Sequence, residues 1–532
     1  MSAPPPVAPA EISTEALSPA EAAFERWRRI GGAALAPVAF FVAYWLTPGL
    51  KPEGRRLSAV LAAVAVLWVS EALPLPVTAL LGAALCVVLG VAPVKQVLAY
   101  FADPSVFLFI SSFILARAMM LHGLDRRIAL GFLSVRWVAA KPARVLAGVG
   151  VVTAFLSMWV SNTATTAMML PIALGILGAL HRVRVADGAA TGQMDARAWP
   201  FATAMMLMVA YAASIGGIGT PAGSPPNLIG IGLIRRMAGV DITFFRWMTL
   251  MVPLLTVMGL ALVLLLHALH PERRGGGAVH AAPRADAGAS LAGYIAAERE
   301  RLGGWTRGQA NTLIAFAVAI TLWVLPGVLA LPGLERAKPL ALWMNARVPE
   351  SVAALSAAIL LFVLPTRLRR GEFTMNWPEA TKIDWGTILL FGGGLSLGSL
   401  MFDTGVAEAL GESIKSRTGA SSLWAMTALS VAFGIVLSET TSNTTSANMV
   451  VPVAIALAQA AGVSPLPPAL GAVLGASFGF MLPVSTPPNA IVYGSGLVPI
   501  PRMVRAGVLF DVLGFFVILG GLRVLCPLMG LI

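Results

Sequence analysis

The chain has 532 residues, of which 57% are hydrophobic and only 12% are charged, and its mean hydropathy is +0.82. Soluble proteins carry about 25% charged residues, so this composition excludes a water-soluble enzyme with a single membrane anchor. The net charge of +12 does not indicate nucleic-acid binding, because the basic residues lie in short segments between apolar runs, as in membrane proteins. Two cysteines, Cys86 and Cys526, are too few for a disulfide framework or a thiolate metal cluster.

Residues 1–30 are predicted to form a disordered cytoplasmic tail. The segment is rich in Pro, Ala and Glu, and Arg26, Arg28 and Arg29 come just before the first apolar run. A signal peptide would place its positive charge before a short apolar stretch that ends in a cleavage site. The composition instead is typical of a segment that cannot build a packed core.

Eleven apolar runs are predicted to cross the membrane, at roughly 20 residues per crossing. They cover residues 31–48, 57–75, 77–97, 105–122, 200–236, 244–268, 312–332, 351–366, 384–404, 467–500 and 506–530. The predicted fold class is therefore an all-α polytopic membrane protein.

Two further apolar stretches, 143–180 and 421–459, are too long for one helix and barely long enough for two. Each has a polar cluster at its centre, Ser161-Asn162-Thr163 in the first and Ser442-Asn443-Thr444 in the second. Non-helical backbone inside a membrane persists only against protein or water. We therefore predict two re-entrant hairpins whose polar turns mark a site.

The distribution of basic residues predicts the orientation of the chain. With the N-terminus inside and both hairpins returning to their side of entry, the inner segments hold 23 Lys and Arg residues and the outer segments hold 12. This bias indicates a cytoplasmic N-terminus.

The two hairpins are copies of one pattern. Ser157, Ser161-Asn162-Thr163, Met168 and Pro171 recur 281 residues later as Ser438, Ser442-Asn443-Thr444, Met449 and Pro452. A second pair of breaks, Gly223-Ser-Pro-Pro-Asn227 and Ser485-Thr-Pro-Pro-Asn489, recurs at an offset of 262. Two matches in the same order indicate a duplicated unit. Each unit has five crossings, an odd number, so the second must enter the membrane inverted, with discontinuous helices near the midplane.

The breaks are almost free of charge. No Asp, Glu, Lys or Arg lies in 145–181 or 200–234, and Glu439 is the only one in 418–501. Hydroxyls, carboxamides and half-helix N-termini can hold an anion, and backbone and hydroxyl oxygens can hold a small cation. A dianion without a positive partner would be costly to bury. The simplest hypothesis places one sodium ion at each hairpin tip, with a shared anion between them, so that ion binding precedes anion binding.

With four motifs in this order, the sequence from about residue 31 to 530 resembles the divalent anion/sodium symporter family. The resemblance implies an elevator-type transporter that works as a homodimer, with Krebs-cycle carboxylates or, less often, sulfate as substrates. It also implies scaffold helices at 31–142 and 312–420 and transport parts at 143–270 and 421–532. The cytoplasmic linker predicted between the halves, at 271–311, matches nothing specific in the family and is predicted from its Gly, Ala and mixed charges. The linker composition is that of a flexible segment.

The resemblance also implies site residues. The anion would contact Ser161, Asn162, Thr163, Ser224, Pro225, Ser442, Asn443, Thr444, Thr486 and Pro487. One sodium ion would be held by Ser157, Ser161, Asn162 and the carbonyl of Gly223, and the other by Ser438, Thr441, Asn443 and the carbonyl of Ser485.

The predicted function is sodium-coupled symport of C4-dicarboxylates such as succinate, malate or fumarate into the cell, across a bacterial inner membrane. Sodium is the coupling ion, and no organic cofactor, enzymatic chemistry or nucleic-acid partner is expected. Some relatives are exchangers in which basic residues replace sodium; no basic residue is expected near these tips, and Arg117 and Arg523 are expected to snorkel or pair within helix packing. Alternatives are a citrate or sulfate symporter, a proton-coupled or exchanging carrier that uses Glu439, and an ion channel. The position that matches Glu439 in the first repeat is Met158, which favours a structural, hydrogen-bonded role for this carboxylate.

Overall fold

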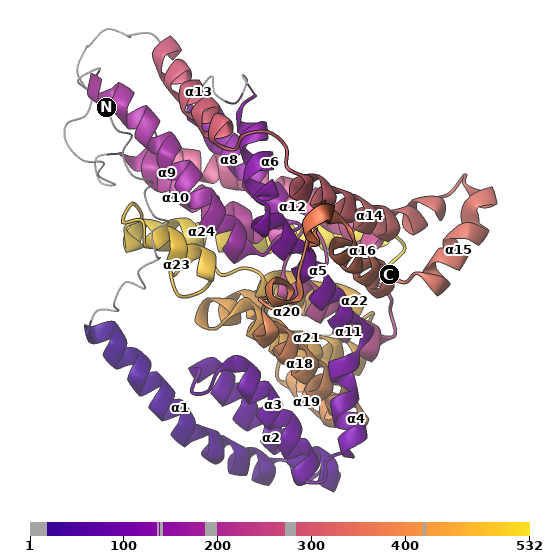
Figure 1. Ribbon diagram of the computed structural model, residues 1–532. Coiled ribbons are helices and arrows are strands. Elements are labelled where there is room, and N and C mark those ends of the chain that lie inside the picture. The colour runs from indigo at the N-terminus through magenta and orange to yellow at the C-terminus, as the bar shows by residue number, and fades with distance from the viewer. Residues whose placement is uncertain (1–18, 136–137, 139–141, 187–198, 272–283, 419–421) are drawn as a thin grey trace.

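The computed structural model is built almost entirely of helices (Figure 1). It describes residues 19–135, 138, 142–186, 199–271, 284–418 and 422–532. The first half of the described chain comprises α1 (Pro19–Leu46), α2 (Pro52–Ser70), α3 (Leu75–Val88), α4 (Val94–Ala99), α5 (Pro104–Leu121), α6 (Leu124–Leu133), α8 (Pro142–Ser157), α9 (Asn162–Ala186), α10 (Pro200–Gly217), α11 (Pro225–Ala238) and α12 (Phe244–Leu269).

The second half begins after α13 (Arg284–Arg301). It comprises α14 (Arg307–Leu329), α15 (Lys338–Arg347), α16 (Glu350–Val363), the short antiparallel strands β1 (Pro365–Arg367) and β2 (Glu372–Phe373), α17 (Trp377–Ala380), α18 (Trp385–Asp403), α19 (Val406–Thr418), α20 (Leu423–Thr440), α21 (Asn443–Ala460), α22 (Leu466–Ala476), α23 (Pro487–Tyr493) and α24 (Ile500–Leu528). The 3-10 turns η1 (Tyr100–Ala102) and η2 (Glu335–Ala337) lie between helices, and a third, η3 (Leu368–Arg370), joins β1 to β2.

Helix length and composition support fewer full spans than the eleven predicted crossings. Nine helices in the described part of the chain are long and apolar enough to cross a membrane, or up to ten if α15 and α16, bent by 72°, are one span. The difference arises because α3 and α22 are short, and because α2 carries Glu53, Arg55 and Arg56 in its first turns. In contrast, α9 and α20, each predicted as one arm of a hairpin, are long enough to span.

Both predicted hairpins are present as helix–turn–helix units. α8 and α9 are joined by residues 158–161, and α20 and α21 by residues 441–442. Both predicted breaks are present too, between α10 and α11 and between α22 and α23. In each case a Pro-Pro pair occupies the first turn of the second half-helix, where the missing N–H of proline costs nothing.

Two predicted flexible segments contain helix. α1 starts at Pro19, so residues 19–30 of the predicted tail are helical, while residues 1–18 lie outside the described residues. Within the predicted linker, α13 packs against α6 and α9 through buried Leu291 and Ile295. Glu298 of this helix forms ion pairs with Arg126 at 2.5 Å and with Arg301 at 2.7 Å.

Helix packing repeats the internal duplication. α10 packs against α8, α9 and α12, and its counterpart α22 packs against α20, α21 and α24. The halves also cross over: α9 and α10 contact α23, while α21 and α22 contact α11. The sequence repeat is thus a structural repeat, and the broken helices of both halves meet at the centre of the molecule.

Aromatic residues fill the core beside the second break. Phe478 and Phe480 of the break loop pack edge-to-face at 5.1 Å between ring centroids, and both contact Phe510 of α24. The buried Tyr211 hydroxyl of α10 donates to the carbonyl oxygen of Phe480 at 2.7 Å. These contacts fix the second break against the first half of the chain.

Candidate functional site

The two hairpin tips have the same internal hydrogen bond. The Ser157 hydroxyl donates to Asn162 Oδ1 at 2.8 Å, and the Ser438 hydroxyl donates to Asn443 Oδ1 at 2.8 Å. Ser157 ends α8 and Ser438 lies in the last turn of α20, and in both tips the asparagine begins the second helix. This bond orients the asparagine amide group at the start of α9 or α21.

The two helix breaks are also held in the same way. Asn227 Nδ2 donates to the carbonyls of Gly217 at 2.7 Å and Thr220 at 2.8 Å. Asn489 Nδ2 donates to the carbonyls of Gly479 at 3.0 Å and Leu482 at 2.9 Å. Carbonyls at a helix end lack intrahelical partners, and one buried carboxamide satisfies two of them. The sequence pattern contained both asparagines, but spacing alone gave no reason to assign them this role.

The hairpin tips and breaks meet around one cavity of about 460 Å³. All ten residues predicted to contact the anion line it: Ser161, Asn162, Thr163, Ser224, Pro225, Ser442, Asn443, Thr444, Thr486 and Pro487. α9, α11 and α21 all begin at residues of this lining. Their N-termini carry partial positive charge, which favours a bound anion.

The residues predicted to bind sodium at the first tip lie partly behind this lining. Ser157 is fully buried, and a Cβ atom built on Gly223 would lie 2.6 Å from the carbonyl oxygen of Gly217 and 2.9 Å from those of Ser157 and Met158. Asn162 Oδ1 is close by, at 2.2 Å from a Cβ atom built on Gly217. The first tip thus gathers the oxygen atoms that a small cation prefers.

The second tip is similar but contains a carboxylate. Ser438 and Thr441 are buried, and the Thr441 hydroxyl has no hydrogen-bond partner among the described residues. The Ser438 hydroxyl lies within 2.9 Å of the carbonyl of Ala476, and a Cβ atom built on Gly479 would lie 3.3 Å from Ser485 Cβ.

Glu439 is buried beside this second tip. Its carboxylate accepts hydrogen bonds from the backbone N–H groups of Phe480 at 2.6 Å and Met481 at 2.9 Å, and from the Ser485 hydroxyl at 2.6 Å. These contacts tie α20 to the second break and agree with the structural role favoured for Glu439. Asp511 of α24, a second buried carboxyl that the sequence interpretation did not consider, interacts with it.

The expectation that no basic residue lies near the tips was wrong. Arg117 of α5 and Lys382, just before α18, line the cavity together with Ser161 and Ser442. Arg117 does not snorkel; it donates to Glu379 at 2.7 Å, and Lys382 donates to the other oxygen of Glu379 at 2.6 Å. Lys382 and then Arg117 lower the pKa of Glu379 below its ordinary value. Neither basic residue lies close to the tips in sequence, so only the tertiary fold reveals them.

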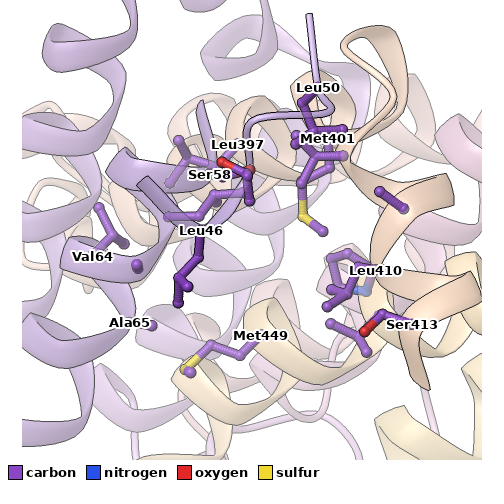
Figure 2. Close-up of a pocket in the computed structure, with 18 of the residues that line it drawn as sticks. Leu46, Leu50, Ser58, Val64, Ala65, Leu397, Met401, Leu410, Ser413 and Met449 are labelled. Carbon is purple, nitrogen blue, oxygen red and sulfur yellow. The ribbon is translucent and has the colours of Figure 1, made fainter. Parts of the chain in front are cut away.

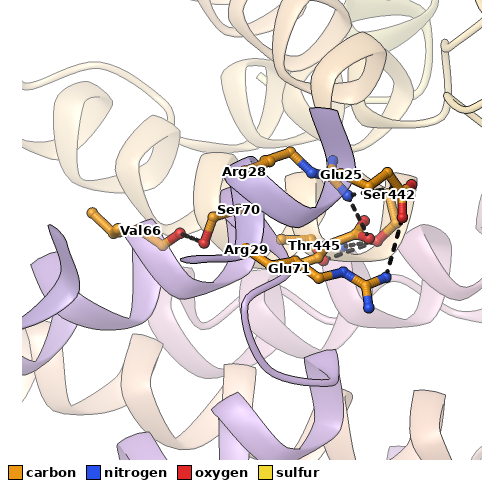
Figure 3. A network of polar contacts seen from close by, with 8 residues as sticks. All are labelled: Glu25, Arg28, Arg29, Val66, Ser70, Glu71, Ser442 and Thr445. Carbon is orange, nitrogen blue, oxygen red and sulfur yellow. Dashed lines mark hydrogen bonds and ion pairs between the residues drawn. The ribbon is translucent and has the colours of Figure 1, made fainter. Parts of the chain in front are cut away.

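A second cavity, of about 550 Å³, continues from the first. The two share Asp384, Thr387, Ser442 and Thr444. Its far side is lined by Arg29 of α1 and Glu71 at the end of α2. Figure 3 shows this side, where Arg28 pairs with Glu71 at 3.0 Å and the Ser442 and Thr445 hydroxyls lie 2.9 Å apart. The central cavity therefore adjoins a second one that reaches Arg29 of α1.

A cavity larger than these two lies elsewhere in the molecule. It has a volume of about 690 Å³ and lies between α2, α18, α19 and α21, with a mainly apolar lining that includes Leu46, Leu397 and Met449 (Figure 2). None of the predicted anion or sodium residues lines it. Cavity volume alone would thus have led away from the predicted anion and sodium residues.

Within the described ranges, no three His, Cys, Asp or Glu side chains are grouped to hold a metal ion. Apart from the Glu439 carboxylate, the oxygens gathered at the tips are the neutral oxygens of hydroxyls, carboxamides and backbone carbonyls.

Discontinuous helices, duplicated hairpins and a cavity lined by the Ser-Asn-Thr turns of both hairpins define the class of membrane transporters with internal repeats. Comparison with known proteins agrees with this class. Residues 32–531 match the family described as "Sodium:sulfate symporter transmembrane region", and the chain belongs to this family, known also as the divalent anion/sodium symporters. It is accordingly a transporter and not an enzyme.

Named relatives cover most of the chain. An "Uncharacterized transporter" of Haemophilus influenzae is 35% identical over 489 residues, 90% of this chain and 94% of that protein. A protein of Staphylococcus saprophyticus named "Sodium-dependent dicarboxylate transporter SdcS" is 32% identical over 491 residues, 92% of this chain and 89% of its own length. Among solved structures, the YdaH transporter of Alcanivorax borkumensis matches with a TM-score of 0.51 at 12% identity, covering 81% of this chain and 86% of that chain, which is a likeness of fold alone.

Proposed function

We propose that the protein is a symporter that carries C4-dicarboxylates, such as succinate, malate or fumarate, into the cell together with sodium ions. The observation that carries the proposal is that ten residues from two hairpins and two broken helices line one cavity. Relatives named as sodium-dependent dicarboxylate transporters, 31–32% identical to this chain, support the choice of ion and substrate class.

The anion site would work through neutral donors. Hydroxyls of Ser161, Thr163 and Ser442 and the amides of Asn162 and Asn443 can donate to carboxylate oxygens, and the N-termini of α9, α11 and α21 add partial positive charge. A dianion has two ends, and the two copies of the Ser-Asn-Thr turn offer one donor set for each end.

Sodium coupling would follow from shared residues. Asn162 and Asn443 belong to both the ion and the anion sets, so a bound sodium ion fixes the amide that the anion then contacts. Each bound cation also offsets the negative charge of the anion. Both effects make anion affinity depend on sodium, and thermodynamic linkage makes sodium affinity depend equally on the anion.

Uptake of radiolabelled succinate into proteoliposomes tests the proposal. An inward sodium gradient should drive accumulation, whereas a potassium gradient or a pH gradient alone should not. Uptake that is indifferent to sodium would overturn the coupling. Competition by citrate and sulfate in the same assay distinguishes the dicarboxylate proposal from the citrate and sulfate alternatives, and saturable uptake separates a carrier from a channel.

The second candidate is a proton-coupled carrier. It is favoured by one observation, that Glu439 of α20 and Asp511 of α24 are both buried carboxyls. Uptake driven by a pH gradient without sodium, and lost in Glu439→Gln, would support it. Sodium-driven uptake that persists in Glu439→Gln would eliminate it.

We further propose a homodimer in the bacterial inner membrane, with a cytoplasmic N-terminus and elevator-type movement of the hairpin-bearing parts. The large apolar side chains exposed on α1, such as Trp27 and Trp45, are suited to lipid or to a second copy of the chain. Mass measurement in detergent and site-directed cross-linking would test the oligomer.

A further inference from the structure

The strongest feature outside the predicted site is the group of charges at the edge of the central cavity. Arg117 and Lys382 line the cavity, and both contact Glu379 of α17. Asp384 is the other charged residue of the lining, but its carboxylate caps α18 and accepts from Thr387 N–H at 3.0 Å and from the Thr387 hydroxyl at 2.5 Å. The lining thus carries two cations, which share Glu379 as their counter-ion, and one acid, which is engaged in the cap of α18.

The geometry of Glu379 shows what these cations can bind. One of its oxygens accepts from Arg117 Nη2 at 2.7 Å, and the other accepts from Lys382 Nζ at 2.6 Å. A carboxylate is therefore held with one oxygen on each cation, which is the strong charge-assisted form of this contact. Side-chain exposures of 28% for Arg117 and 58% for Lys382 show that neither cation is sealed from the cavity.

We propose that Arg117 and Lys382 bind one carboxylate of the transported anion at the cavity edge, and that Glu379 occupies them while the anion is absent. The proposal rests on the proposed function and adds two specificity-determining residues to it. When the anion arrives, one of its carboxylates replaces that of Glu379 on Arg117 and Lys382. The two cations therefore attract a dianion and have a counter-ion at every stage. A monocarboxylate has a single carboxylate, which can contact either the neutral hairpin tips or the two cations but not both. Monocarboxylates would therefore be poor substrates.

Opposite effects of the acidic and basic variants test this inference. At saturating sodium, Arg117→Met and Lys382→Met should raise the KM for succinate uptake about fivefold, whereas Glu379→Gln, which removes the competing carboxylate, should lower it about threefold. Glu379→Gln should have no effect on KM in the Arg117→Met/Lys382→Met background. If the three residues only fasten α5 to α17, all three single variants will change KM in the same direction or not at all, and the proposal fails.

Lys338→Met provides a matched control. Lys338 forms an i,i+3 ion pair with Glu335 at 2.5 Å, as Lys382 does with Glu379, but it does not line the cavity. Its KM should equal that of the wild type. Size-exclusion profiles and thermal unfolding of each variant show whether it is folded, and Arg117→Lys, which keeps the charge, should recover most of the affinity if Arg117→Met does not fold.

Direct titration of purified protein with succinate in sodium buffer separates this inference from the proposed function. If the wild type transports no dicarboxylate, the proposed function fails, and the titration is repeated with citrate and sulfate. Weaker anion binding in Arg117→Met and tighter binding in Glu379→Gln would still support the cation pair. Unchanged binding in both variants would overturn it even if wild-type transport is sodium-driven.

Discussion

Asn162 and Asn443 hold the same position in the two halves, each fixed by a serine hydroxyl at 2.8 Å. Each lines the cavity and each begins a helix. A carboxamide can accept from the serine, or bind a cation, through its oxygen while it donates to an anion through its nitrogen. This double capacity explains why asparagine is suited to a site that couples an ion to an anion.

Replacement of either asparagine should abolish transport without loss of the fold. Asn162→Ala and Asn443→Ala each remove one amide donor and one oxygen ligand, so we expect sodium-driven succinate uptake to fall at least about tenfold. The measurement is the initial uptake rate, with the size-exclusion profile as a control. Wild-type rates in both variants would remove these residues from the site.

The backbone around Gly223 leaves no room for a side chain at this position. A Cβ atom there would lie within 3 Å of three backbone carbonyl oxygens, so the backbone of the break would have to move. We expect Gly223→Ala to lose most of its sodium-dependent uptake. Gly259→Ala is the control, because a Cβ atom on that glycine of α12 meets nothing within 4 Å. Equal uptake by the two variants would contradict the sodium role of the Gly223 carbonyl.

At the scale of elements, the broken helices depend on Asn227 and Asn489. Each carboxamide bridges two carbonyls across its break, and both asparagines are fully buried. Prolines end the helix in both copies, but only these bonds determine how the two half-helices are oriented. Each break is therefore an ordered turn with its own hydrogen bonds and not a disordered interruption of the helix.

Asn489→Leu should weaken the second break. Two buried carbonyls lose their donor, at a cost of about 1–3 kcal/mol each, so the thermal unfolding temperature should fall. The stabilisation that sodium adds should decrease as well, since the Ser485 carbonyl moves with the break. A variant with the wild-type unfolding temperature and sodium response would show that the bonds do not position the site.

At the scale of the whole molecule, the central cavity adjoins the second one, which shares Thr387 with it and reaches Arg29. Arg29 and Lys382 both lie in segments that the distribution of basic residues places on the cytoplasmic side. The conformation described is accordingly an inward-facing one under the predicted orientation.

Labelling of a single cysteine tests this conformation. Thr387→Cys should react with a membrane-impermeant maleimide from the cytoplasmic side, and sodium with succinate together should slow the reaction at least about threefold, as expected for a binding-linked protection. The native Cys86 and Cys526 are buried and should stay unlabelled. Reaction only from the opposite side would reverse the predicted orientation or the conformation.

The sequence by itself determined the class of fold, the duplicated unit and ten of the residues that line the central cavity. It could do so because membrane helices need long apolar runs, and because polar turns and Pro-Pro pairs inside such runs are rare and recur here at constant offsets. It overestimated the number of full crossings, since apolar composition does not show where short helices such as α3 and α22 end.

Only the tertiary structure decided which distant residues join the site. Arg117 and Glu379 are 262 positions apart and lie on elements outside both hairpins, yet they meet at the cavity edge. Hydrophobic periodicity and motif spacing describe a chain locally, whereas side-chain contacts between distant helices depend on how those helices pack. The expectation of a site without basic residues was wrong for this reason, and the charges at its edge became visible only when the helices were assembled.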